Sequence, residues 1–599
     1  MTTPKDPGLP TEPGSRRDPG QPGRPRGLWY VLMMVLATGL LMPSVRKGVL
    51  GRIWSDTIDP EMARLAQEMV RKEIGETAPP VMRRAPADLL PTGLDTVGLR
   101  EIWHREPEGS DVFPVALFQA LKDPETGRPL IEIMDRFGFI PSPEDDSGLP
   151  VGFSRLRSKQ GDFVMTGINC AACHSTRITH RGRALHIDGA PNLVDVEAFF
   201  RGVLGAAEGL LKPERGRERI EFLLRFAYFN SVELERLRKA GAATGAAPDT
   251  VGVAPASLSP AEQAEQALEF LIQRLRSAGR IGESFNRQTP AGPGRADSFG
   301  IIRNLLMTEE LVGGSGNFRP MTAPVSIPPL FGFASFTNLH CDGNTTTGTD
   351  RNYAQAIALG ADLDPKTFAS STRPHGLFRM ESAALKLVPP AWPESIFGRL
   401  DRSRVARGRE LFRSQSCLEC HGGETWTRLE VIGTDPNRLL NYNEPVHVSG
   451  GRLESYATNL HRFTLAVKQK AYEDHQVPEY ERRRMDTWHP GVPQVWIETR
   501  DKGYFTRPLR GLWATAPFLH NGSVPTLWDL LKPAAERPKR FAVGHREFDP
   551  VKVGYVETPT TPVWFLDTTV SGNHNTGHEY GTRLTDEEKR DLLEYLKTL

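Results

Sequence analysis

Cys170-Ala-Ala-Cys173-His174 recurs in type further along the chain as Cys417-Leu-Glu-Cys420-His421. This pattern attaches c-type haem, because two thiols one helical turn apart add to the two vinyl groups and the next imidazole lies beneath the iron. A zinc site or a redox dithiol also uses paired cysteines, but both trailing histidines would then be accidental. The sequence therefore predicts two covalently bound c-type haems, with His174 and His421 as iron ligands.

Composition sets the broad class of the protein. The chain has 599 residues, 39% hydrophobic and 25% charged, which is typical of folded globular proteins. Its 74 lysines and arginines balance 73 acidic residues, so no overall positive field favours nucleic acid as a partner. Five cysteines are too few for a disulfide scaffold in so long a chain. Cysteine is therefore expected to serve chemistry here.

The N-terminal segments indicate export. Residues 1–26 are rich in Pro, Gly and Arg and are expected to form a disordered tail. Residues 27–45 carry no charge and would reach roughly 28 Å as a helix, which is enough to span a membrane. A cleaved signal peptide is the alternative, although its apolar run would be shorter. Since c-type haem is attached outside the bacterial cytoplasm, we expect a single-pass inner-membrane anchor with the bulk of the chain in the periplasm.

The repeated pattern predicts two related domains. We expect a mainly α fold with long loops, because strand patterning is sparse. The predicted divisions are a linker at 46–109, an N-terminal c-haem domain at 110–395 with an insertion at 201–280, and a C-terminal cytochrome c domain at 396–599. Val388-Pro-Pro-Ala-Trp-Pro breaks any helix near the second boundary.

Helical periodicity adds four local predictions. Amphipathic helices are expected over residues 201–238 and 261–280. A helix beginning near Arg402 should run toward the second pattern, with Leu411 and Phe412 able to pack on a haem. Thr585 and Glu588 form a capping-box pattern that begins a C-terminal helix with an apolar stripe.

The sixth iron ligand separates an electron carrier from a reactive centre. After the second pattern the only methionine is Met485, whose charged neighbours favour a solvated face over a haem pocket. Histidines remain as candidates for the second haem, namely His447, His461, His475, His489, His520, His545, His574 and His578. For the first haem the nearest candidates are His180, His186 and His340, and either an open site or closure by a histidine fits the sequence.

Further stretches carry a family resemblance. They include Leu339-His340-Cys341-Asp-Gly-Asn344 and Ala516-Pro-Phe-Leu-His520-Asn-Gly-Ser523-Val-Pro-Thr-Leu527. Other matching stretches are 149–154, 167–174, 187–191, 294–297, 323–330 and 577–581. With the two haem patterns, they resemble the bacterial dihaem cytochrome c peroxidase superfamily, and within it most of all the rubber oxygenase branch.

The resemblance implies roles for individual residues. His174 would be the proximal ligand of a first haem whose other face binds O2 or H2O2. His421 would be proximal at the second haem, with His578 as its sixth ligand and His520 in reserve or as a pocket residue. Cys341 departs from the branch, which commonly has tryptophan at that position of the motif. A calcium ion between the domains is left open.

Three classes of function fit these observations. In a dihaem oxidoreductase, the first haem reacts with peroxide or dioxygen, and the second exchanges electrons with it and with a redox protein partner. An oxygenase version would hold an apolar alkene over the first haem, with Phe331, Phe333 and Phe336 as pocket walls, unless these three are ordinary core. The alternatives are a tethered electron carrier with two six-coordinate haems and a binding module with structural haems.

Overall fold

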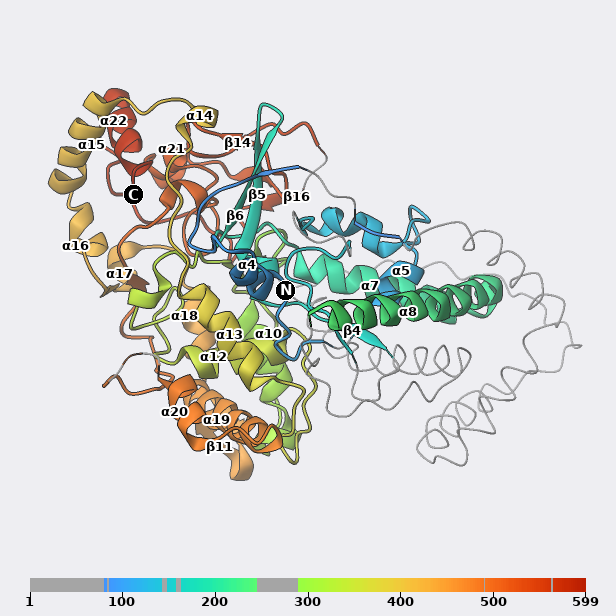
Figure 1. Ribbon diagram of the computed structural model, residues 1–599. Coiled ribbons are helices and arrows are strands. Elements are labelled where there is room, and N and C mark those ends of the chain that lie inside the picture. Colours follow the sequence, from blue (N-terminus) through green and yellow to red (C-terminus); the bar gives the residue numbers. More distant parts are fainter. Residues whose placement is uncertain are drawn as a thin grey trace, which may run out of the picture. The chain divides into compact units, whose positions relative to one another are not determined.

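The computed structural model describes residues 80–82, 86–111, 113–142, 148–157, 163–244, 289–487, 489, 491–561 and 564–599 (Figure 1). The predicted tail 1–26, anchor 27–45 and helix 261–280 lie outside these residues. Within the described part of the chain, no helix has the length and apolar character needed to cross a bilayer.

An aromatic core organises the segment before and after the first pattern. Its helices are α5 (Val115–Ala120), η1 (Leu130–Phe137), α7 (Val196–Leu211) and α8 (Gly216–Thr244). α4 (Val97–Arg105) instead packs in a second cluster around Trp103. Phe118, Phe139 and Phe153 meet Phe199 of α7 with ring centroids 5.0 to 6.2 Å apart. The predicted helix 201–238 is confirmed in type but divided, since a short turn, η2 (Pro213–Arg215), separates α7 from α8.

A hairpin follows the first pattern without an intervening loop. The pattern forms α6 (Cys170–His174), and β5 (Ser175–His180) begins at the next residue and pairs antiparallel with β6 (Arg183–Asp188). β1 (Asp88–Leu89) adds a parallel edge strand. A second small sheet joins β2 (Phe113–Pro114), β4 (Val164–Thr166) and β3 (Leu156–Arg157). His174 is therefore held at the base of a sheet.

Helices between the two patterns pack with helices that follow the second. Between the patterns lie α10 (Ser298–Leu306), α11 (Glu309–Val312), α12 (Gly348–Ala358) and α13 (Pro374–Ala384). After the second pattern come α18 (Asn437–Tyr442), α19 (Tyr456–Asp474) and α20 (Glu479–Asp486). Tyr353, Tyr442 and Tyr456 are almost fully buried here. Two antiparallel strand pairs accompany them. β7 (Arg295–Ala296) pairs with β8 (Val325–Ser326), and β10 (Val446–Val448) forms a hairpin with β11 (Arg452–Glu454).

The second pattern lies in a small helical unit at the C-terminal end. α15 (Arg402–Ser414) leads into α16 (Cys417–His421) and packs on α22 (Asp586–Leu596), as Figure 1 shows. The predicted capping box of Thr585 and Glu588 is confirmed. The other elements are α14 (Glu394–Phe397), α17 (Leu429–Ile432), α21 (Leu527–Leu530), and the strand pairs β9 (Thr425–Thr427) with β12 (Tyr504–Thr506), β13 (Arg540–Val543) with β16 (Trp564–Asp567), and β14 (Phe548–Asp549) with β15 (Gly554–Tyr555).

Gly408 allows α15 and α22 to approach closely. A Cβ atom at this position would lie 2.0 Å from the backbone oxygen of Asp591, so a methyl group cannot fit without moving a helix. We expect Gly408→Ala to lower the free energy of unfolding by about 1 to 3 kcal/mol, measured by chemical denaturation. Gly205→Ala in α7 is the matched control, because its Cβ meets nothing within 4 Å. Equal stability of the two variants would contradict the close approach.

Candidate haem site

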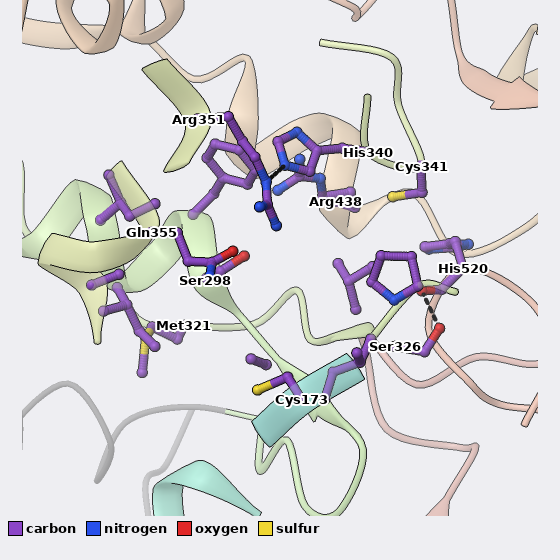
Figure 2. A pocket seen from close by; sticks show the side chains of 18 of the residues that line it. Cys173, Ser298, Met321, Ser326, His340, Cys341, Arg351, Gln355, Arg438 and His520 are labelled. Atoms are coloured by element: carbon purple, nitrogen blue, oxygen red, sulfur yellow. Dashed lines mark hydrogen bonds between the residues drawn. The ribbon is translucent and has the colours of Figure 1, made fainter. Parts of the chain in front are cut away.

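Both cysteine patterns line one large cavity. Figure 2 shows part of its wall, with Cys173 of the first pattern, His340, Arg351 and His520. Cys173 and His174 reach it from α6, while Cys417, Cys420 and His421 reach it from α16. Its volume is about 1300 Å³, above the roughly 300 to 1,000 Å³ of an ordinary small-molecule site. The cavity therefore has room for more than one cofactor-sized group between the two patterns.

His174 is oriented as a metal ligand would be. Its Nδ1 lies 2.9 Å from the carbonyl oxygen of Pro328, which leaves Nε2 available for a metal. Burial, together with the nearby charge of Arg351, lowers the pKa of His174 to about 3 although the Pro328 contact opposes the shift. The imidazole is therefore neutral near pH 7, as a ligand must be.

The neighbouring cysteines are also held in place. Asn169 caps α6 through a hydrogen bond from the Ala171 amide, 3.0 Å long. The Cys170 thiol lies 2.8 Å from a carboxylate oxygen of Glu108 and 3.5 Å from the amide nitrogen of Gln355. None of the five cysteines, all of which lie among the described residues, forms a disulfide, so the four in the patterns are available for thioether bonds.

His421 repeats this arrangement at the second pattern. Its Nδ1 lies 3.1 Å from the carbonyl oxygen of Arg507, so the same ring nitrogen is engaged as in His174. The two helices differ in their surroundings, because α16 has no buried residue whereas α6 buries Ala171, Ala172 and His174. The second pattern is therefore near the surface and the first is interior.

His578 faces His421 across the cavity. Their ring centroids lie 6.4 Å apart at an interplanar angle of 47°. Two imidazoles bound to one metal atom through bonds of about 2 Å would have centroids about 6 Å apart, so the spacing fits a shared metal. Burial lowers the pKa of His578 to about 4, with His421 adding to the shift. Within the described residues, its buried Nδ1 has no hydrogen-bond partner. These two imidazoles would suit a single haem iron held between them.

His520, the reserve ligand, lies elsewhere on the wall. Its ring stacks on Tyr504 with centroids 4.2 Å apart, and its Nε2 lies 3.0 Å from the Tyr504 hydroxyl. Burial lowers its pKa to about 3. The reading of His520 as a pocket residue agrees with this position.

The segment that carries Tyr504 and His520 is similar to a known protein family. Residues 503–542 match the family model described as RoxA-like, cytochrome c-like. This RoxA-like cytochrome c segment contains Tyr504, Arg507 and His520, and it supports the predicted family at a coarse level. The chain accordingly has the signature of a haem-containing oxidoreductase.

Two proteins of Sinorhizobium fredii are similar to the chain. The uncharacterized protein y4iJ is 29% identical over 83% of this chain and 90% of its own length. The uncharacterized protein y4iM is 30% identical over 35% of this chain and 51% of its own length. Neither name states an activity.

Of the three histidines considered for the first haem, only His340 lines the cavity. Its Nδ1 lies 2.7 Å from the side-chain oxygen of Asn344, and its Nε2 accepts from Arg351 at 3.4 Å. His180 contacts the carbonyl oxygen of Phe548 instead. Since both nitrogens of His340 are engaged, the arrangement favours an open first site.

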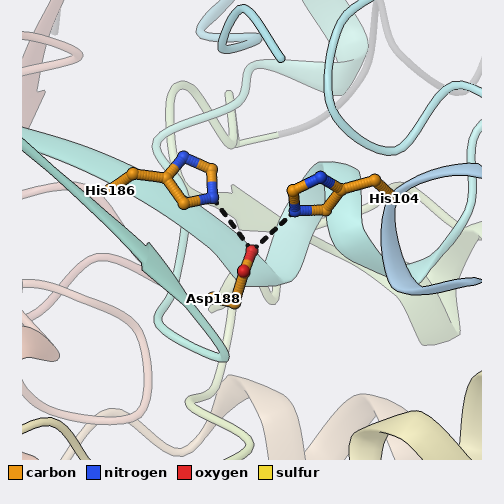
Figure 3. Close-up of side chains that lie close together, drawn as sticks. All are labelled: His104, His186 and Asp188. Atoms are coloured by element: carbon orange, nitrogen blue, oxygen red, sulfur yellow. Dashed lines mark hydrogen bonds and ion pairs between the residues drawn. The ribbon is translucent and has the colours of Figure 1, made fainter. Parts of the chain in front are cut away.

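His186 belongs to a buried cluster with His104 and Asp188 (Figure 3). The Nε2 atoms of His104 and His186 lie 2.8 and 3.0 Å from the same Asp188 oxygen. Ser175, next to His174, donates to that oxygen at 2.8 Å, and Arg100 lies 3.7 Å from the other. These contacts stabilise the buried negative charge of Asp188, so we interpret the cluster as a hydrogen-bond network that fixes the segment after His174.

The three phenylalanines and Met485 are all buried in apolar clusters. Phe331, Phe333 and Phe336 are buried in hydrophobic clusters and are not among the cavity-lining residues, which favours ordinary core. The solvated position expected for Met485 is wrong, since it is 4% exposed and packs with Tyr472 and Val477. Its burial is decided by these apolar contacts, to which Phe378 of α13 also belongs, and not by the charged residues on either side of it.

Several cavity residues escaped sequence reasoning. Arg351 and Gln355 line the cavity from α12, one helical turn apart, and this spacing is the signal that could have paired them. Met307 and Met321 also line it, although both precede the second pattern. Cys341 lines it too, packs with Tyr504, and has its pKa raised to about 12 by burial.

Proposed function

We propose that the chain is a periplasmic dihaem c-type oxidoreductase, anchored through residues 27–45, in which the first haem binds O2 or H2O2 and the second transfers electrons. The observation that carries the proposal is the difference between the two proximal histidines. His421 faces a second imidazole, that of His578, at 6.4 Å. The histidine nearest in motif to the first site, His340, has both nitrogens engaged.

The residues of the chain have distinct tasks in this proposal. Cys170 and Cys173 would hold one haem and Cys417 and Cys420 the other, with His174, His421 and His578 as iron ligands. Bound haem supplies one-electron chemistry and a site for an oxygen ligand. The carbonyls of Pro328 and Arg507 fix the ring orientations of His174 and His421. Such contacts also make the ligand nitrogen more basic.

The difference in exposure between the two sites suggests a direction of electron flow. α16 has no buried residue, so a redox protein could approach the second haem from solvent. α6 is largely buried, so the first haem would be shielded from water and from other proteins. Electrons would thus enter at the second site and be used at the first.

The cavity wall favours an apolar co-substrate. Ile302 and Leu306 of α10 and Ile357 of α12 line it, together with Met321 and Leu363. Such a surface offers apolar contact and few hydrogen bonds. It supports the oxygenase version, in which dioxygen attacks an apolar alkene, over a peroxidase that needs only peroxide and a reductant.

A second candidate function is a pure electron carrier. Met307 and Met321 line the cavity, and a thioether bound to the first iron would close that site. The haem would then exchange electrons without binding oxygen.

Electron paramagnetic resonance of the full-length protein, before and after addition of peroxide, tests the proposal. We expect one high-spin ferric signal from the first haem, which changes with peroxide, and one low-spin signal from the second. Two low-spin signals that ignore peroxide would overturn the oxidoreductase and leave the electron carrier. A haem content of one per chain would overturn both.

A further inference from the structure

The loop that carries His578 is held from two sides by buried charged residues. Asp435 is 1% exposed and Arg537 is 2% exposed. Their partners lie on the loop backbone between Gly572 and His578, so these two side chains fix the position of the imidazole that faces His421. The inference below rests on the proposed function, because it concerns the sixth ligand of the second haem.

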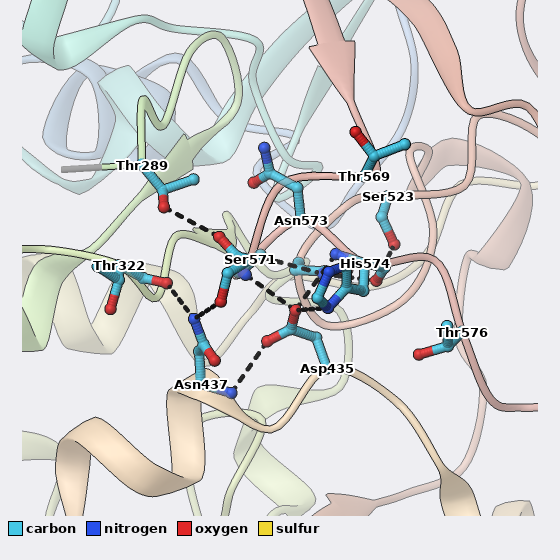
Figure 4. A network of polar contacts seen from close by, with 12 residues as sticks. Thr289, Thr322, Asp435, Asn437, Ser523, Thr569, Ser571, Asn573, His574 and Thr576 are labelled. Carbon is cyan, nitrogen blue, oxygen red and sulfur yellow. Dashed lines mark hydrogen bonds and ion pairs between the residues drawn. The ribbon is translucent and has the colours of Figure 1, made fainter. Parts of the chain in front are cut away.

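Asp435 holds the beginning of the loop (Figure 4). Its Oδ2 accepts hydrogen bonds from the backbone N–H of Gly572 at 2.9 Å and of His574 at 3.2 Å. The same oxygen lies 3.1 Å from Nδ1 of His574. Its Oδ1 accepts from the Asn437 N–H, which ties the carboxylate to α18.

Arg537 holds the end of the loop. Its guanidinium donates to the carbonyl oxygens of Asn575 at 2.6 Å, Gly577 at 2.8 Å and His578 at 3.2 Å. It also donates to Lys532 and Leu530, which anchor it beside α21. All these partners are backbone carbonyls, so the hydrogen bonds of the guanidinium fix the backbone conformation of the loop. Planar, five-donor geometry makes arginine suited to this task and lysine a poor substitute.

The backbone needs such support at the ligand itself. His578 has a φ of 49°, in the left-handed region that costs free energy for a residue other than glycine. Gly577 precedes it with a φ of 72°, and a Cβ there would lie 2.3 Å from the carbonyl carbon of Gly433. The His578 N–H donates to Ile432 at 2.8 Å. An unfavourable conformation persists only where neighbouring contacts impose it.

We propose that Arg537 is the positioning residue for the sixth ligand of the second haem, with Asp435 supporting it from the other side. Through three carbonyls in the last four residues of the loop, Arg537 keeps the His578 imidazole opposite His421. His421 and His578 would then both hold the second haem, and exogenous ligands would bind at the first haem alone.

Carbon monoxide binding to the dithionite-reduced holoprotein tests this proposal. We expect the wild-type protein to bind one CO per chain and His578→Ala to bind two. In Arg537→Gln, the CO affinity of the second haem should rise at least about tenfold, because His578 loses three backbone hydrogen bonds that hold its loop and competes less well with CO. In the ferric form of Arg537→Gln, the high-spin signal should grow and the low-spin signal should shrink. The CO affinity of Arg537→Lys should be close to that of Arg537→Gln.

Arg546→Gln is the matched control. Arg546 is partly buried and donates to two backbone carbonyls, those of Gly138 and Phe139, away from the His578 loop. It should lose stability without gaining a second CO site. If Arg537→Gln does not fold, Asp435→Asn provides the same measurement from the other side of the loop, with a weaker CO site expected.

The outcomes separate this inference from the proposed function. A wild-type protein that readily binds two CO molecules would overturn the bis-histidine assignment itself. A wild-type protein that binds one CO, together with Arg537→Gln and Asp435→Asn variants that also bind only one with unchanged affinity, would overturn the positioning role alone. A second CO site in Arg546→Gln would also contradict the positioning role of Arg537, since any loss of stability would then be enough to open the second haem to CO.

Discussion

Replacing Cys170 and Cys173 by alanine is expected to leave one covalent haem per chain and to abolish the reaction with peroxide. Both thioether bonds of the first haem would be lost, while Cys417, Cys420 and the facing pair of His421 and His578 remain. Haem content per chain, measured as the pyridine haemochrome, should fall by half. The low-spin signal of the second haem should persist, because its ligands do not involve α6.

The exchange of cysteines at the second pattern is the matched control. Cys417→Ala with Cys420→Ala should also halve the haem content, but it should remove the low-spin signal and keep the high-spin one. The two double variants should therefore have complementary spectra. If both lose the same signal, the two haems are not assigned to the two patterns in the way we propose.

Arg351→Met is expected to slow the reaction with peroxide by about a hundredfold, the usual cost of removing one preorganised donor. The guanidinium lines the cavity from α12, and its charge is among the causes that lower the pKa of His174. Negative charge develops on peroxide oxygen as the O–O bond breaks, and a fixed cation in a buried cavity stabilises it. The rate constant follows from stopped-flow absorbance at increasing peroxide concentration.

Arg351→Lys should restore part of this rate, since it keeps the charge and loses the planar donors. The low-spin signal of the second haem should be the same in all three proteins, which excludes general damage. A peroxide rate in Arg351→Met equal to that of the wild type would remove Arg351 from the reaction.

Local sequence signals predicted local structure well. The capping box at Thr585, the helix that leads into Cys417 and the two cysteine patterns all depend on residues close together in the chain. Their geometry follows from the spacing of a helical turn and needs no distant partner. The resemblance to a known family supplied His578, which no spacing rule would have chosen among eight histidines.

Long-range contacts account for what the sequence did not reveal. Met485 looks solvated beside its arginines, but it is buried with Tyr472 and Val477 in a cluster that Phe378 of the distant helix α13 completes. Arg351 gives no sign in the sequence that it lines the same cavity as His421, 70 positions later. Arg537 resembles any surface arginine until its carbonyl partners are known. Such roles depend on how the chain folds back on itself.

The unequal burial of α6 and α16 has a consequence for the biogenesis of the protein. In the folded chain Ala171 and Ala172 of α6 are at most 1% exposed, whereas Leu418 of α16 is 46% exposed. An enzyme that joins haem to thiols needs access to the whole pattern. If the two patterns bind haem as we propose, the first would have to be loaded while its part of the chain is still unfolded. The second could be loaded before or after folding, so folding of the chain would limit maturation at the interior haem alone.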